Sequence, residues 1–263
     1  MAQERFWFQS SRLENSEVRA ELYFEALRSG PLTTVRELTG GTPFVVLSPH
    51  PDDETLGAGG LIAEARAMQQ DVDVIVVTDG SGSHPRSKEY PRQRLVDLRY
   101  SEVHEAGLAL GLPPDRVTFL GLPDTAVPKN GPAFDNAVET TLAVIARSEA
   151  DTLFVTWEKD PHCDHEASSA LAKAVRRARP GLRLWAYPIW GWHLVPSLEV
   201  DQPFPKAVRI DISKYRDRKL AAIEAHASQM SDLIGDDPDG FRFNQQSLTP
   251  FLGGYEYFIE VPA

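Results

Sequence analysis

From residue 44 onward the chain alternates short apolar runs with longer amphipathic segments. The short runs are rich in β-branched residues and predict strands, which span residues 44–48, 72–78, 117–121, 152–157 and 182–187. The longer segments between them predict helices at about 55–68, 92–110, 134–148 and 165–178. Two of the strands are almost continuously apolar, as parallel strands covered on both faces are. We therefore expect an α/β fold, a Rossmann-like doubly wound, mostly parallel sheet with helices on both faces.

The two ends of the chain carry weaker patterns. An amphipathic stretch near Val18 to Leu27 is predicted to pack on the outside of the sheet. Beyond Tyr187 the pattern predicts a strand, a helix and a final strand, at 206–210, about 213–229 and 255–261. We expect residues 1–263 to form one domain, with a core at about 43–190 and a C-terminal extension, about 191–263, that edges the functional site.

The charge balance and the cysteine content exclude several classes of protein. Lys and Arg number 27 against 38 Asp and Glu, so the net charge is 27 − 38 = −11, and no basic run could follow a phosphate backbone. Nucleic acid is therefore not an expected partner. No apolar run approaches the roughly 20 residues of a membrane helix, and the N-terminal residues lack the apolar segment of a secretory signal. With Cys163 as the single cysteine, these features predict a cytoplasmic protein without a membrane span or an intrachain disulfide; they leave the oligomeric state open.

The candidate chemistry begins where the first predicted strand ends, in the segment FVVLSPHPDDETLGAGG at 44–60. Directly after the strand come four ionisable residues, His50, Asp52, Asp53 and Glu54. Such a cluster is unfavourable in a strand-to-helix turn unless a cation or water solvates it. His50 and Asp53 are close enough along the chain to hold one ion together. The alternative is an ordinary helix N-terminus, where acidic residues complement the helix dipole without any chemistry.

A second cluster, DPHCDHE at 160–166, follows the predicted strand at 152–157. The carboxyl ends of parallel strands meet at one edge of a sheet, so both clusters are able to face the same crevice. Catalytic zinc typically keeps three protein ligands and one open position. We predict His50, Asp53 and His165 as the metal ligands. The cofactor is then Zn²⁺ or another divalent metal such as Fe²⁺, because a set of two histidines and one aspartate suits zinc, ferrous iron and cobalt alike.

Asp52 and His162 are the candidates for acid–base chemistry beside these ligands. Asp52 would lie next to the ion without binding it, placed to accept a proton from water whose pKa the cation has lowered to about 7. His162 as a fourth ligand would close the site to water, so we assign it to oxyanion stabilisation or to protonation of the leaving amine. Its alternative role is a loop histidine bonded to the backbone. Cys163 is either a thiolate ligand or, more simply, a small buried filler.

The two clusters together resemble the hallmark motifs of the PIG-L/LmbE-like N-acetylglucosaminyl deacetylase family. One family motif is a strand followed by (A/S)HPDDE, here SPHPDDE at 48–54, and the other is HPDH, here HCDH at 162–165 with cysteine in place of proline. The resemblance covers about 43–190. The roles it implies are metal ligation by His50, Asp53 and His165, general-base action by Asp52, and an acid or oxyanion role for His162.

Two further residues enter through the resemblance alone. Arg99, which with Glu102 matches the family's RxxE helix, and Asp124, in a segment like its LGxxD, are implied to contact sugar hydroxyls. The alternative for Arg99 and Glu102 is a structural pair at helical spacing. The C-terminal aromatic residues are also open to two interpretations, a wall that stacks on a pyranose or part of the core; they are Tyr187, Trp190, Trp192 and His193.

The leading functional hypothesis is a metal-dependent amide hydrolase, an N-deacetylase acting on a small-molecule N-acetylglucosamine-type sugar conjugate. One alternative in the same class is an amidase of sugar or thiol conjugates. A non-catalytic, metal-dependent sugar-binding protein is another, and it would release no acetate. A nucleotide-binding module, suggested by the glycines at 57–60, fits poorly because the ionisable cluster would repel a pyrophosphate at the helix N-terminus.

Overall fold

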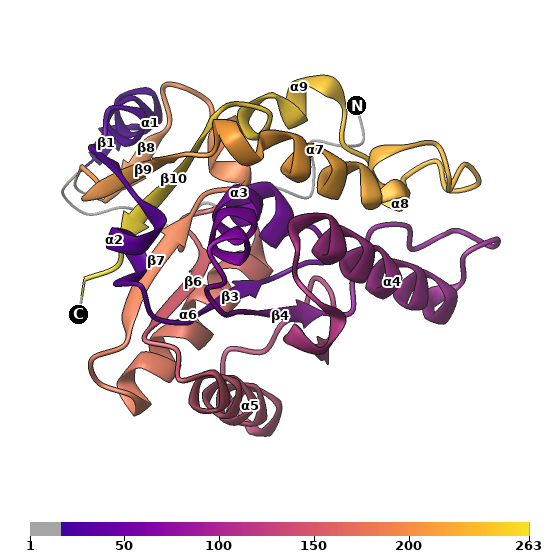
Figure 1. Cartoon of the computed structure of the whole chain (residues 1–263). Helices are drawn as coiled ribbons and strands as arrows, with labels where there is room; N and C mark the ends of the chain where they lie inside the picture. The colour runs from indigo at the N-terminus through magenta and orange to yellow at the C-terminus, as the bar shows by residue number, and fades with distance from the viewer. Residues whose placement is uncertain (1–16, 203, 263) are drawn as a thin grey trace.

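The computed structural model describes residues 17–202 and 204–262, and among these residues eight strands form one sheet (Figure 1). Their order across the sheet is β2-β9-β10-β7-β6-β3-β4-β5. The strands are β2 (Leu32–Thr33), β3 (Phe44–Ser48), β4 (Val72–Thr78), β5 (Val117–Leu122), β6 (Thr152–Thr156), β7 (Arg183–Tyr187), β9 (Ala207–Asp211) and β10 (Tyr255–Glu260). Strands β7, β6, β3, β4 and β5 pair in parallel, whereas β10 is antiparallel to both β7 and β9. The predicted, mostly parallel sheet is therefore confirmed.

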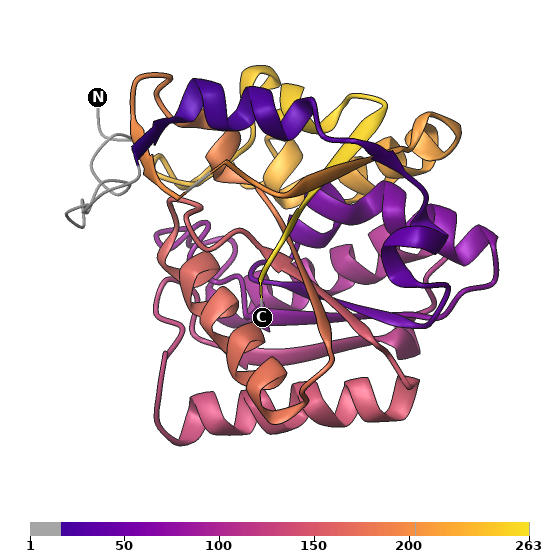
Figure 2. The ribbon, with the colours of Figure 1, turned by 90° about the vertical axis from the view of Figure 1, so that its left-hand side faces the viewer.

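Helices cover both faces of this sheet. Helices α3, α4 and α7 pack on one face and α5 and α6 on the other, each group with its own apolar cluster (Figure 1). Helix α1 packs over Trp157 and the β10 side of the sheet, far from α5 (Figure 2). The α-helices are α1 (Ala20–Arg28), α2 (Val35–Thr39), α3 (Asp53–Ala67), α4 (Arg92–Leu110), α5 (Pro132–Ser148), α6 (Cys163–Ala178), α7 (Arg216–Ala225), α8 (Ala227–Met230) and α9 (Gln245–Leu248). Among the described residues, no helix is long and apolar enough to cross a membrane.

The strand order reverses between β3 and β6. Strand β3 is followed along the chain by its neighbour β4, while β6 lies on the other side of β3. The helices that follow these two strands, α3 and α6, lie on opposite faces. A crevice forms at the carboxyl ends of strands at such a reversal, and ligands bind there in open α/β sheets. The two clusters predicted from the sequence begin at this point.

The C-terminal extension differs from its prediction at the predicted helix, and it also contains β8 (Glu199–Asp201) and α9, which were not predicted. The helix predicted at about 213–229 is instead a 3₁₀ turn, Ser213–Tyr215, followed by α7 and α8. The helix is interrupted at His226, whose φ of −79° and ψ of 55° are not helical. The break turns the completely buried imidazole of His226 toward the start of α3. Strands β9 and β10 belong to the large sheet, whereas β8 pairs with β1 (Glu17–Arg19) in a separate two-stranded ribbon.

The glycines of α3 let this helix pack unusually close to its neighbours. A Cβ at Gly57 would lie 2.1 Å from the Tyr187 ring, and one at Gly60 would lie 2.4 Å from Ile212. The carboxylate of Glu256 on β10 accepts hydrogen bonds from the backbone N–H groups of Gly60 and Leu61 at 2.6 and 2.8 Å. Gly57 therefore serves the contact between α3 and β7, and Gly60 the contact between α3 and the C-terminal extension.

Candidate metal centre

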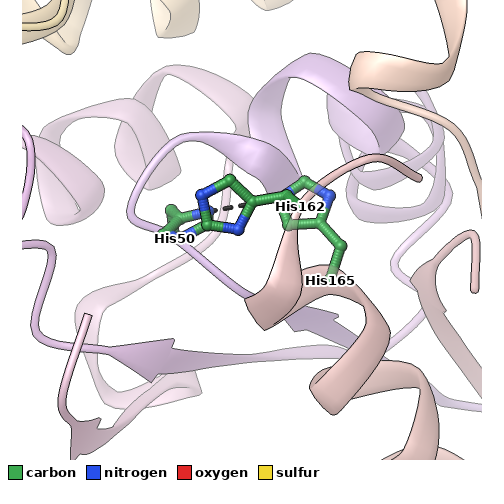
Figure 3. A group of neighbouring side chains, drawn as sticks. All are labelled: His50, His162 and His165. Atoms are coloured by element: carbon green, nitrogen blue, oxygen red, sulfur yellow. Dashed lines mark hydrogen bonds between the residues drawn. The ribbon is translucent and has the colours of Figure 1, made fainter. Parts of the chain in front are cut away.

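The structure brings His50, Asp53 and His165 together at the crevice. His50 lies in the turn after β3, Asp53 is the first residue of α3, and His165 lies in the first turn of α6. His50 Nδ1 is 3.1 Å from Asp53 Oδ2, His165 Nε2 is 3.2 Å from the same oxygen, and the two nitrogens are 3.2 Å apart. Figure 3 shows the imidazoles of His50, His162 and His165 turned toward one another. Three potential ligand atoms thus form a nearly equilateral triangle.

This triangle fits a divalent cation. Ligand atoms about 2.0–2.1 Å from one ion are about 2.9 Å apart in octahedral geometry and about 3.3–3.4 Å apart in tetrahedral geometry. The observed separations of 3.1, 3.2 and 3.2 Å lie between these two values. Two imidazole nitrogens at this distance have room for one proton between them, so a cation is a natural partner for both lone pairs. The residues present therefore suit zinc, ferrous iron or cobalt.

A buried carboxylate that sequence reasoning did not single out, Asp160, fixes the orientation of His165. Its Oδ2 lies 2.6 Å from His165 Nδ1, and both side chains are fully buried. The backbone N–H groups of Ile189 and Gly191 also donate to this carboxylate. An N–H on Nδ1 leaves the lone pair of Nε2 facing the triangle, as in most histidines that bind metals. The signal for Asp160 in the sequence was its place two residues before His162.

Two more carboxylates hold His50 on its other side. His50 Nε2 lies 3.2 Å from Asp164 Oδ2 and 3.4 Å from Asp124 Oδ1. Asp164 in turn accepts hydrogen bonds from the backbone N–H groups of Thr125 and Val127. Asp124, which the resemblance assigned to sugar hydroxyls, accepts one from Gly82 and has a buried side chain. The structure places Asp124 behind His50, where it orients the imidazole so that Nδ1 points at the triangle.

Without a cation, the charged forms of His50, Asp53 and His165 stabilise one another. Burial opposes a charge on His165, but Asp53 and the hydrogen bond to Asp160 outweigh it and raise the pKa of His165 to about 9. Burial also opposes the charge of Asp53, yet His165 and His50 hold the pKa of this carboxyl well below its usual range. The triangle therefore carries a proton that a metal ion has to displace.

Asp52 is held at the N-terminus of α3 in a strained conformation. Its φ of 155° with ψ of −26° is a region that residues with a side chain rarely occupy, and such strain concentrates at functional sites. Burial raises the pKa of Asp52 to about 7, although Arg99 acts in the opposite direction. Arg99 Nη2 donates to Asp52 Oδ2 at 3.0 Å and to Pro51 O at 2.9 Å. The buried Arg99 guanidinium thus binds the predicted base.

His162 caps helix α6 beside the triangle. Its Nδ1 accepts a hydrogen bond from the Asp164 backbone N–H at 3.2 Å, so a neutral ring carries its proton on Nε2. Burial and the nearby charges of His50 and His165 lower the pKa of His162 to about 3. The ring of His162 lies 4.5 Å from that of His50, measured between centroids. His162 is therefore a neutral donor next to the three potential ligands.

Other predicted residues lie farther from the triangle or in different surroundings. The interpretation of Cys163 as a buried filler is wrong, because this residue is exposed, with its thiol 3.5 Å from Thr125 O. Tyr187 belongs to the core, where its hydroxyl donates to Leu47 O. Trp192 packs against Phe24 on α1.

Two remaining residues of the predicted sets are held by C-terminal elements. Trp190, between the two backbone groups that bind Asp160, stacks on Phe243. Glu102 does not pair with Arg99, since its carboxylate accepts hydrogen bonds from the backbone N–H and the hydroxyl of Ser228.

Known proteins resemble this chain in sequence or in fold. A deacetylase of Saccharomonospora viridis named for 1D-myo-inositol 2-acetamido-2-deoxy-alpha-D-glucopyranoside is 29% identical over 253 residues, covering 80% of this chain and 91% of that protein. The N,N'-diacetylchitobiose deacetylase of Pyrococcus horikoshii has the same fold, with a TM-score of 0.61 at 21% identity over 84% of this chain and 83% of that one. So does the 4-carboxy-2-hydroxymuconate hydratase of Pseudomonas putida KT2440, with a TM-score of 0.57 at 22% identity over 72% and 80% of the two chains.

The hydratase shows that this fold alone does not determine the reaction. The family comparison is more specific, because a family model described as GlcNAc-PI de-N-acetylase matches residues 45–176, half of the chain. The match includes the turns after both β3 and β6, and with them all three corners of the triangle. The chain belongs to the PIG-L family of de-N-acetylases.

Proposed function

We propose that this protein is a metal-dependent N-deacetylase that hydrolyses the acetamide of an N-acetylglucosamine-type sugar conjugate. The observation that carries the proposal is the triangle of His50, Asp53 and His165, with atoms 3.1–3.2 Å apart and Asp52 and His162 beside it. A divalent cation bound there supplies a Lewis acid for the acyl oxygen and lowers the pKa of water to about 7.

Asp52 accepts the proton of the attacking water. Without a cation the pKa of Asp52 is about 7. A cation bound beside it would lower this pKa, so the carboxyl would be ionised at neutral pH and able to accept a proton. Arg99 holds Oδ2 of Asp52 and fixes the plane of the carboxylate, so that Oδ1 is the oxygen that accepts the proton. Asp52 then returns this proton to the leaving nitrogen, which departs as a free amine, and the acetyl group departs as acetate.

His162 stabilises the acyl oxygen while negative charge develops on it. Its backbone hydrogen bond leaves Nε2–H as the donor of the neutral ring. A donor placed in advance and shielded from water supplies a large share of the stabilisation of a tetrahedral transition state. This role requires no proton transfer, in agreement with the low pKa of His162.

The substrate class rests on the relatives. The Saccharomonospora viridis protein is named for a 2-acetamido-2-deoxyglucopyranoside joined to inositol, and its alignment extends over most of both chains. A sugar acetamide of this kind is therefore the best-supported substrate. We further propose that the core and the C-terminal extension act as one domain, because Ile212, Ile223 and Phe258 belong to the same apolar cluster as Val46.

The decisive experiment measures acetate release from N-acetylglucosaminyl inositol, N,N'-diacetylchitobiose and free N-acetylglucosamine. Each substrate is incubated with protein loaded with Zn²⁺, Fe²⁺ or Co²⁺, and with chelator-treated protein. The Asp52→Asn variant serves as the control for contaminating activity. Metal-dependent release that this variant lacks supports the proposal. Sugar binding without acetate release from any of the three substrates would favour a binding protein or an amidase of other conjugates, and it would overturn the proposal.

A further inference from the structure

The segment between α7 and α8 carries polar side chains that are completely buried against the candidate site. His226 and Ser228 are 0% exposed and Gln229 is 1% exposed. Each of the three contacts a different element of the site: His226 the start of α3, Ser228 the Glu102 carboxylate on α4, and Gln229 the hydroxyl of Ser83 in the loop after β4. Buried polar side chains at such a junction are unfavourable unless they are hydrogen-bonded to a defined partner.

His226 forms the end of a short hydrogen-bonded chain. Its Nε2 lies 3.2 Å from Thr55 Oγ1 and 3.5 Å from Glu54 Oε1, and the Thr55 hydroxyl donates to Glu54 Oε1 at 2.9 Å. The imidazole therefore donates to Thr55, which donates to Glu54. Nδ1 of His226 has no hydrogen-bond partner among the residues that the structure describes. All the contacts of this imidazole with the site thus run through Nε2.

Glu54 connects this series of hydrogen bonds to Asp52, the predicted base. Its second oxygen, Oε2, accepts a hydrogen bond from the backbone N–H of Asp52 at 3.2 Å and lies 2.8 Å from the Ser48 hydroxyl. Asp52 is the residue with the strained backbone, and a strained conformation persists only where its surroundings hold it. Arg99 holds the carboxylate of Asp52, whereas Glu54 holds its backbone.

We propose that His226 is a positioning residue that keeps Asp52 in its strained conformation by fixing Glu54 through Thr55. This inference rests on the proposed function for its effect on turnover, but the geometry that it describes does not. His226 lies 50 residues beyond the segment matched by the family model, which ends at residue 176, so a residue that positions the base lies outside that segment. The turn between α7 and α8 is then required for turnover as well as for covering the sheet.

Charge supports the same arrangement. Burial lowers the pKa of His226, but the hydrogen bond to Glu54 and the charges of Glu54 and Asp52 outweigh burial and raise it. Burial of the Glu54 carboxyl acts against its ionisation, yet His226 and Ser48 lower its pKa. His226 and Glu54 therefore stabilise each other's charged forms inside the protein.

The test uses three substitutions of His226, two of which differ in which nitrogen of the imidazole they replace. In His226→Gln the side-chain amide nitrogen reaches the position of Nε2, whereas in His226→Asn it reaches only the position of Nδ1. Because the site contacts run through Nε2, we expect His226→Gln to keep most of the turnover. We expect His226→Asn and His226→Leu to lower kcat by roughly 10- to 100-fold, the range typical of residues that orient the ligands of a metal site, with KM within about twofold. His104→Leu is the matched control, because this half-buried histidine of α4 packs against Phe119 on β5 and not against Glu54 or Thr55, and it should not change kcat.

Hydrogen exchange provides a measurement that does not depend on activity. In the His226→Asn variant, the amides at 52–56 should exchange at least about tenfold faster than in the wild type, while those of β6 should be unchanged. Metal content, measured by mass spectrometry, should also stay the same. Equal kcat and equal exchange in the Gln and Asn variants would overturn the inference. If no substrate releases acetate, the proposed function fails, but the exchange at 52–56 still decides the role of His226.

Discussion

Raising the pH from 7.5 to 9 should destabilise the protein when no cation is bound at the triangle of His50, Asp53 and His165. The folded-state pKa of His165, about 9, exceeds its unfolded value of about 6.5. Its contribution to stability is therefore fully present below pH 6.5 and is lost as the pH rises through 9. For these two pKa values, the loss between pH 7.5 and 9 is about 2 kcal/mol from His165 alone.

Other groups reinforce this trend or have already titrated. The pKa values of His50 and His226 are also raised, so both add to the loss in the same direction. His162, with a pKa of about 3 in the folded protein, is neutral in both states above pH 7.5. Asp52 has a folded-state pKa of about 7, so most of its effect on stability lies below this window.

Urea unfolding of the chelator-treated protein at the two pH values measures the difference in the free energy of unfolding. Protein loaded with Zn²⁺ should show a much smaller loss, because the ligand nitrogens then hold the ion instead of a proton. The His165→Gln variant, studied without metal, should lose part of the dependence. Equal stability of the chelator-treated protein at pH 7.5 and 9, or an equal loss with metal bound, would refute the reasoning.

Three further predictions concern single side chains. Asp52→Asn should lower kcat by about 10²- to 10⁴-fold, the contribution of a general base, with metal content unchanged; a fully active variant would remove Asp52 from the mechanism. Asp160→Asn replaces one acceptor oxygen beside His165 with a donor and should weaken metal affinity by about 10- to 100-fold in calorimetric titration, whereas unchanged affinity would contradict its orienting role. In the wild type, Lys219 Nζ lies 2.8 Å from the buried Glu256 carboxylate. Lys219→Met removes this cation and should reduce the free energy of unfolding by about 3–5 kcal/mol. A loss below about 1 kcal/mol in urea unfolding would show that the backbone donors of α3 are sufficient to stabilise the carboxylate.

The parallel sheet and the meeting of His50, Asp53 and His165 were predictable because both follow from local patterns. Apolar periodicity located β3 and β6, and a polar cluster directly after each strand had to emerge at the same edge of the sheet. Their placement needs no information from distant parts of the chain.

The partners of these residues were less predictable. Asp160 was visible as part of a motif, but its role depends on the direction in which the His165 ring turns. His226 lies in a stretch whose periodicity resembles one continuous helix, and nothing local signals the break that turns its side chain inward. Its contact with Glu54 spans 172 residues of sequence, 226 − 54, and arises from the way α7 packs on α3. Such contacts follow from tertiary packing, which periodicity does not encode.

The position of β10 between β7 and β9 has a consequence for biosynthesis. While the chain emerges from the ribosome, the strands up to β7 are able to pair in order, which leaves β7 as an open edge. Only when residues 255–260 have emerged is that edge covered, and only then does the Glu256 carboxylate reach the backbone of α3, the helix that begins with Asp53. A nascent chain interrupted before this strand would therefore contain every metal-ligand candidate but lack the support that keeps the first of its long helices in place.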